Sequence, residues 1–190
     1  MARMVIRPRL ARTVLRLARW RTEGTLPRRG IVVGAPHTSN WDWVVSLLLA
    51  WSQGRQPRIM VKKEFFAGPL APVMRATGAV SIDRASPGAD IAALVALIER
   101  SDEFLLTIAA EGTRSKSDFW KSGFYRLSQQ TGLPVTLAFI DGPSRTVGSG
   151  LSFVPSGDLA ADMDMVRAFY ADKRGLHPAN RTEPRLRNES

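Results

Sequence analysis

Short apolar runs and helical patterns alternate along most of the chain. Apolar and β-branched residues gather in runs of strand length at residues 31–34, 58–61, 79–82, 104–108 and 135–140. Between these runs, apolar positions recur at helical spacing, most clearly from Pro87 to about Arg100, where Ser86 is a suitable N-cap. This alternation predicts an α/β protein, a single-domain αβα sandwich with a largely parallel central sheet.

Further helices are expected at residues 8–21, 44–50, 123–131 and 159–173. The run at 44–50 is far shorter than the roughly 20 apolar residues of a membrane span, so it is interpreted as a buried core helix. From Gly175 onwards the chain is polar and is expected to fray. The chain is thus divided into a basic N-terminal segment at 1–29, a domain at 30–174 and a polar tail at 175–190.

The helix expected from Pro8 carries an apolar arc beside a stripe of arginines. At about 100° per residue, the arc contains Ile6, Leu10, Val14, Leu17 and Trp20, whereas Leu15 falls outside it. Two interpretations fit this periodicity equally. The helix either lies in a membrane interface with its arginines toward lipid phosphates, or packs on the protein's own core with its arginines solvated.

Composition narrows the chemistry. The chain has 190 residues, of which 44% are apolar, with no cysteine and two histidines. Disulfides, a thiol nucleophile and a thiolate metal site are therefore excluded. With so few imidazoles we expect no catalytic metal.

The net charge of +10 is concentrated near the N-terminus, where nine arginines precede the first expected strand. Such a field attracts nucleic acid, phospholipid headgroups or a phosphorylated substrate, and charge alone does not choose among them. Arginines interrupt every apolar stretch that could form a signal peptide. The expected compartment is the cytoplasm.

The most specific chemical signal is the pair His37 and Asp42, at the junction between an expected strand and an expected helix. Residues five apart on a continuous helix differ by about 140° and do not face each other, but across a turn entering a helix they can meet. Asp42 would lie in the first helical turn, where the helix dipole favours a carboxylate. A carboxylate beside an imidazole orients it as a general base.

Three cations follow other expected strands. Lys62 follows the strand at 58–61, Arg84 follows the strand at 79–82, and Arg114 follows the strand at 104–108. Because ligands bind beyond the carboxyl ends of strands in open α/β sheets, these side chains are expected to converge with His37 on an anion, most simply a phosphate. As structural alternatives, Arg84 and Arg114 could pair with Asp83 or Glu111, Lys63 could replace Lys62, and Lys121 could be a solvated helix-start charge.

Across roughly residues 30–140 the chain resembles the glycerolipid acyltransferases of the lysophosphatidic-acid acyltransferase type. Four segments carry the resemblance. His37 to Asp42 is similar to the family's His-x4-Asp motif, and Glu111 to Ser115 to its Glu-Gly-Thr-Arg block. Gly78 to Arg84 is similar to the second block, and Leu133-Pro134-Val135 to part of the fourth.

The resemblance implies transfer of a fatty acyl group from acyl-CoA or an acyl carrier protein thioester to the hydroxyl of a lyso-lipid in phospholipid synthesis, without a cofactor. The commonest acceptor is 1-acylglycerol-3-phosphate. His37 would be the general base and Asp42 its orienter. The implied substrate-binding residues are Lys62, Arg84, Glu111, Gly112, Thr113, Arg114 and Lys121.

Within that scheme, Lys62, Arg84 and Arg114 would bind phosphate, while Glu111 and Gly112 would shape the acceptor pocket. Backbone N–H groups after His37, or a nearby cation, would stabilise the oxyanion. Asn40, Trp41 and Trp43 would form the walls of the turn, with Trp41 a candidate to flank the acyl chain. The enzyme would attach peripherally to the anionic inner face of the cell membrane.

Departures from the family pattern leave the acceptor open. Ala110 and Leu137 stand where the family usually has proline, and no transmembrane hairpin precedes the histidine. A lyso-ornithine lipid or a glycolipid is the alternative acceptor. A non-enzymatic basic protein that binds nucleic acid is the alternative class; it explains the charge but not the His-x4-Asp turn, and few aromatics are interleaved with the basic residues to stack on bases.

Overall fold

A seven-stranded, largely parallel sheet forms the centre of the computed structural model, which describes residues 2–62, 71–72, 77–82, 94–98 and 100–189. Its strand order is β1-β7-β6-β2-β5-β3-β4, and all neighbours are parallel except β6 and β7. The strands are β1 (Arg21–Glu23), β2 (Arg29–Ala35), β3 (Pro57–Lys62), β4 (Ala79–Ile82), β5 (Phe104–Ile108), β6 (Val135–Asp141) and β7 (Thr146–Phe153).

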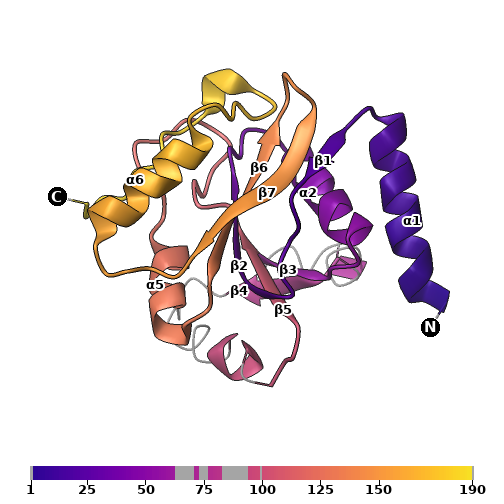
Figure 1. Cartoon of the computed structure of the whole chain (residues 1–190), viewed down its shortest axis with the longest axis horizontal. Helices are drawn as coiled ribbons and strands as arrows, with labels where there is room; N and C mark the ends of the chain where they lie inside the picture. The colour runs from indigo at the N-terminus through magenta and orange to yellow at the C-terminus, as the bar shows by residue number, and fades with distance from the viewer. Residues whose placement is uncertain (1, 63–70, 73–76, 83–93, 99, 190) are drawn as a thin grey trace.

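Helices cover both faces of this sheet (Figure 1). They are α1 (Ala2–Leu17), α2 (Trp41–Ser52), α5 (Gly123–Thr131) and α6 (Leu159–Tyr170), followed by a short 3₁₀ turn, η2 (Pro178–Asn180). Helices α5 and α6 pack on one face, and α2, with α1 outside it, packs on the other. The predicted αβα sandwich with a largely parallel sheet is confirmed.

The central strand β2 is buried from both sides. Ile31, Val33 and Ala35 face the core beneath α5 and α6, and Val32 faces the core beneath α2. This near-continuous burial is typical of parallel strands that are covered on both faces. Because β2 leads directly into α2, its carboxyl end fixes where the turn at His37 begins.

Two strands were not expected from the sequence. Strand β7 is interrupted by Gly148 and Gly150, and β1 is only three residues long and exposed, so neither shows a clear apolar pattern. Strand β7 returns antiparallel after β6 through a turn in which the carboxylate of Asp141 accepts the Ser144 N–H at 3.1 Å. Of the helix expected from Pro87 to Arg100, residues 94–98 are described and helical.

Helix α1 differs from the sequence-based expectation in its start and in its buried face. It begins at Ala2 and contains Pro8, and it packs on α2 through Ala11 and Leu15, which are almost fully buried. Three members of the predicted arc point outward instead: the exposed fractions are 60% for Leu10, 37% for Val14 and 79% for Leu17. Trp20, also in the arc, is partly buried against the core cluster to which Leu15 belongs.

The predicted fraying after Gly175 is wrong for the described residues. The N–H of Gly175 donates to the carbonyl of Ile140 at 3.1 Å, and the N–H of His177 donates to Thr38 Oγ1 at 3.0 Å. Thr182 and Leu186 are buried. Backbone hydrogen bonds therefore hold this polar segment against the end of β6 and the turn after β2.

Among the described residues, no helix is both long and apolar enough to cross a bilayer.

Candidate active site

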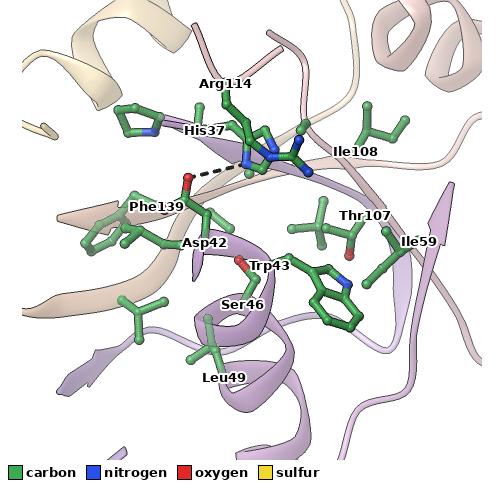
Figure 2. Close-up of a pocket in the computed structure, with 18 of the residues that line it drawn as sticks. His37, Asp42, Trp43, Ser46, Leu49, Ile59, Thr107, Ile108, Arg114 and Phe139 are labelled. Atoms are coloured by element: carbon green, nitrogen blue, oxygen red, sulfur yellow. Dashed lines mark ion pairs between the residues drawn. The ribbon is translucent and has the colours of Figure 1, made fainter. Parts of the chain in front are cut away.

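The structure brings His37 and Asp42 together. His37 lies in the turn between β2 and α2, and its Nδ1 atom is 3.4 Å from Oδ2 of Asp42 (Figure 2). Asp42 is in the first turn of α2 and is 2% exposed, whereas the His37 side chain is half-buried. With Nδ1 facing the carboxylate, Nε2 is the nitrogen left for a substrate proton.

Asp42 also holds the backbone of the turn. Its Oδ2 atom accepts the N–H groups of Thr38 at 2.6 Å and Ser39 at 2.7 Å. These are short, charge-assisted hydrogen bonds in a buried setting, where such bonds are strongest. One carboxylate oxygen therefore fixes both the path of the turn and the orientation of the ring that the turn carries.

A second buried carboxylate completes this arrangement. Glu111 Oε2 accepts the His37 N–H at 3.1 Å, so the amides of three successive residues, 37 to 39, are bound to two carboxylates. Glu111 is 1% exposed, and burial raises its pKa to about 7. The sequence predicts that Glu111 shapes the acceptor pocket, but the structure binds its side chain to the backbone of the turn at His37, and Glu111 is not among the residues that line the cavity.

The same hydrogen bonds narrow the choice of oxyanion-stabilising groups. The N–H groups of His37, Thr38 and Ser39 already point at carboxylates, and the N–H of Trp41 donates to Ser39 Oγ at 3.2 Å. Among residues 37 to 41, this leaves the N–H of Asn40 without a hydrogen bond in the described part of the chain, so one turn amide and the nearby side-chain donors stay open as alternatives.

A cavity of about 610 Å³ opens beside His37 and runs between α2 and the sheet. At its mouth lie Asn40, Gly112, Thr113, Arg114 and Lys121, and Arg114 is drawn next to the His37 ring in Figure 2. The stem of Lys121 lies across Gly112, where an added Cβ would be 3.1 Å from Lys121 Cγ. Four of the predicted substrate-binding residues thus share one rim.

The structure describes the surroundings of two of the four predicted cations, Arg114 and Lys121. Arg114 and Lys121 form no ion pair within the described part of the chain, so the expected pairing of Arg114 with Glu111 is not observed. Lys62 ends β3, but its side chain lies outside the described residues, as do Lys63, Asp83 and Arg84.

Sequence reasoning named Trp43 as a wall residue but missed Ser46 and Leu49. All three line the cavity from α2, while Trp41 is 68% exposed and is absent from the lining. The signal was available, because positions 42, 46 and 49 share one face of a helix that begins at Trp41. On the sheet side, Gly34 pairs with Ala138, and a Cβ added at Gly34 would meet nothing within 4 Å. These two small residues leave the space that the cavity occupies.

Comparisons with known proteins bear on the family and on the fold. The family model Acyltransferase matches residues 18–140. Among solved structures, the chain is similar to the crystal structure of the 1-acyl-sn-glycerophosphate (LPA) acyltransferase, PlsC, from Thermotoga maritima. The TM-score is 0.59 at 16% sequence identity, and the match covers 86% of this chain and 76% of that one. A search of curated protein sequences finds no match.

The chain belongs to the Acyltransferase family. Family membership favours an enzyme over the alternative of a basic nucleic-acid-binding protein without catalysis.

Glu111 gives the folded protein a specific pH dependence. Its pKa is 4.5 in the unfolded chain and about 7 in the folded protein, so between these values the folded state holds a proton that the unfolded chain has lost. Its contribution to stability is fully present below the unfolded pKa and is lost as the pH rises through the folded pKa, a loss of roughly 3 kcal/mol. We expect Glu111→Gln to remove this loss, measured by urea unfolding at about pH 5 and about pH 8.

Glu103→Gln is the matched control, because Glu103 is an exposed carboxylate paired with Arg28 at 3.0 Å. It should follow the wild type at both pH values. If Glu111→Gln instead loses as much stability as the wild type over this range, the carboxyl group does not titrate as described.

Proposed function

We propose that the protein is a lysophospholipid acyltransferase that moves a fatty acyl group from an acyl-CoA or acyl carrier protein thioester to the hydroxyl of a lyso-lipid. The favoured acceptor is 1-acylglycerol-3-phosphate. The observation that carries this proposal is the His37–Asp42 pair, with Nδ1 and Oδ2 3.4 Å apart, at the mouth of an apolar cavity with a cationic rim.

The pair supplies the base for the reaction. His37 Nε2 takes the proton of the acceptor hydroxyl as its oxygen forms a bond to the thioester carbonyl carbon. Asp42 stabilises the resulting imidazolium. The tetrahedral oxyanion then collapses, the C–S bond breaks, and the thiol leaves with the proton from His37. Because a thiolate leaves readily, the scheme needs no covalent enzyme intermediate.

The oxyanion is assigned to a side-chain donor at the rim. Asn40 starts α2 without using its side chain as a cap, and it lines the cavity with Arg114 and Lys121. A donor that is held in place before the reaction stabilises the developing charge without reorganisation. The N–H groups of residues 37 to 39 are already bound to Asp42 and Glu111, which supports a side-chain donor in this role.

The charge of the rim supports a phosphorylated acceptor. Arg114 lies beside His37 in Figure 2 and Lys121 lines the same cavity, and a guanidinium matches two phosphate oxygens at once. Lys62 and Arg84 are assigned to the same phosphate from the sequence. A lyso-ornithine lipid or a glycolipid would present no phosphate to these groups.

The cavity suits the acyl chain. Its inner wall is mostly apolar, and the small residues Gly34 and Ala138 leave space on the sheet side. A hydrocarbon chain with its thioester carbon at His37 therefore has room between α2 and the sheet. Burying such a chain removes apolar surface from water and supplies the binding free energy that positions the carbonyl group.

Helix α1 is proposed to attach the enzyme to the inner face of the cell membrane. Leu10, Val14 and Leu17 form an exposed face beside exposed arginines, an arrangement that suits insertion among anionic headgroups. Trp41, exposed at the start of α2, adds an amphipathic ring of the type enriched at membrane interfaces. Peripheral attachment would bring a lyso-lipid acceptor to the rim.

Replacing the proposed base should abolish acyl transfer. We expect His37→Ala to lower the rate with a lyso-lipid and an acyl thioester by a factor of about 100 to 10,000, which is the usual contribution of general base catalysis. The measurement is thiol release together with mass spectrometry of the lipid product. His177→Ala is the control, because this second histidine has an exposed side chain. Retention of most activity in His37→Ala would rule out this base.

Arg114→Ala separates the two kinds of acceptor. We expect KM for 1-acylglycerol-3-phosphate to rise about tenfold or more, because a hydrogen-bonded ion pair to phosphate is lost, and KM for an acceptor without phosphate to stay unchanged. Arg126→Ala, an exposed arginine on α5, is the control. If phosphate makes no difference to either protein, 1-acylglycerol-3-phosphate is not the acceptor.

Vesicle sedimentation tests the membrane face of α1. We expect the double variant Leu10→Ser with Leu17→Ser to bind anionic vesicles about tenfold more weakly than the wild type, because two apolar side chains no longer insert. Met165→Ser removes an exposed apolar side chain from α6, on the opposite side of the sheet, and should bind normally. Equal binding of the wild type to anionic and neutral vesicles would contradict the proposed role of the arginines.

A further inference from the structure

Two hydroxyl groups interrupt the apolar inner part of the cavity. Ser46 lines it from α2 and Thr107 lines it from β5. The surrounding wall is otherwise formed by Leu26, Val32, Leu49, Ala50, Ile59, Ala138, Ile140 and Val147. In the view of Figure 2 the two hydroxyl-bearing side chains flank the ring of Trp43, one on the helix and the other on the sheet. A purely hydrocarbon ligand could not form a hydrogen bond with either hydroxyl.

The hydroxyl of Ser46 is free in a setting where such groups usually bond to their own helix. Elsewhere in the protein, Thr13 donates to Arg9 O at 3.1 Å, Ser52 donates to Leu49 O at 2.7 Å, and Thr131 donates to Leu127 O at 2.7 Å. Ser46 makes no such bond to the preceding turn, and within the described residues neither Ser46 nor Thr107 has a side-chain hydrogen bond.

An unpaired hydroxyl in an apolar cavity is costly when a ligand excludes water from it. Transfer of a hydroxyl to an apolar environment without a partner is unfavourable, and two such groups face this cavity. A ligand with an oxygen at this depth would give one of them a partner, whereas a saturated chain would leave both unpaired. The site therefore discriminates between acyl chains by an oxygen substituent rather than by length.

The depth of Ser46 indicates where that oxygen lies. Ser46 follows Asp42 by four residues on α2, so it lies slightly more than one helical turn, or about 6 Å, further along the helix. An acyl chain with its thioester carbon at His37 enters along the same helix face. Its third carbon is two bonds beyond the carbonyl carbon, and an O–H···O bond of about 2.7 Å bridges the rest of the distance.

We propose that Ser46 and Thr107 form a binding site for a hydroxyl group on the acyl chain, and that the preferred donors are 3-hydroxyacyl thioesters. This inference rests on the proposed acyl transfer, because it names the class of chain that the cavity takes. The site selects the donor and has no part in the chemical step, so its loss changes preference among chains and leaves His37 and Asp42 in place.

Direct binding tests the site independently of turnover. Tetradecanoic acid and 3-hydroxytetradecanoic acid are titrated by calorimetry into the wild type, Ser46→Ala, Thr107→Val and Ser52→Ala. The wild type should bind the hydroxy acid about threefold to tenfold more tightly, as expected for one added hydrogen bond. Ser46→Ala and Thr107→Val should each reduce this ratio toward one. Ser52→Ala, whose hydroxyl bonds to Leu49 O on the same helix, should keep the ratio.

Turnover is then compared with CoA and carrier-protein thioesters of the same two acids. A matching shift in kcat/KM between wild type and Ser46→Ala would support the proposal. A binding ratio that is equal in wild type and Ser46→Ala, a wild type that favours the unsubstituted acid, or failure of both acids to bind would overturn it. Thioesters that are never consumed would refute the proposed acyl transfer, while the binding ratio would still decide whether the cavity selects a hydroxylated chain.

Discussion

The structure of the site depends on one buried carboxylate at the start of a helix. Asp42 accepts two backbone N–H groups from the turn that precedes it and faces the imidazole of His37 with the same oxygen. The N-terminus of α2 supplies a favourable field for this charge, and burial strengthens each of its hydrogen bonds. An apolar residue at position 42 would lose the two hydrogen bonds to the turn and the contact with His37 Nδ1 together.

Around this carboxylate, the sheet and helix α2 each contribute residues to the site. His37 follows the carboxyl end of β2. Glu111, which follows the neighbouring strand β5, accepts a hydrogen bond from the His37 N–H and so connects the turn to that strand. The charged rim and the apolar interior are then separated in space, with cations near His37 and hydrocarbon walls below it. Such an arrangement suits an amphiphilic substrate, whose polar head and apolar tail meet at the reacting bond.

Elements outside the matched residues 18–140 also support the site. The segment from Gly175 packs closely on the catalytic turn, where a Cβ added at Gly175 would lie 2.8 Å from Thr38 Oγ1, and His177 donates its N–H to that same oxygen. At the other end of the chain, α1 covers α2 from outside while its Leu10, Val14 and Leu17 stay exposed. The turn at residues 37–42 is thus packed against residues that are distant in sequence.

The sandwich fold could be predicted from the sequence, because alternating strand and helix patterns leave few other packings. The meeting of His37 and Asp42 could also be predicted, because a turn entering a helix brings positions five apart together. Which groups face the cavity could not be predicted in this way. Exposure of the arc on α1, burial of Glu111 beneath the turn and the space above Gly34 all depend on neighbours far along the chain. Local periodicity shows which residues of a helix or strand share a face. Which of those faces is buried depends on the elements that pack against it.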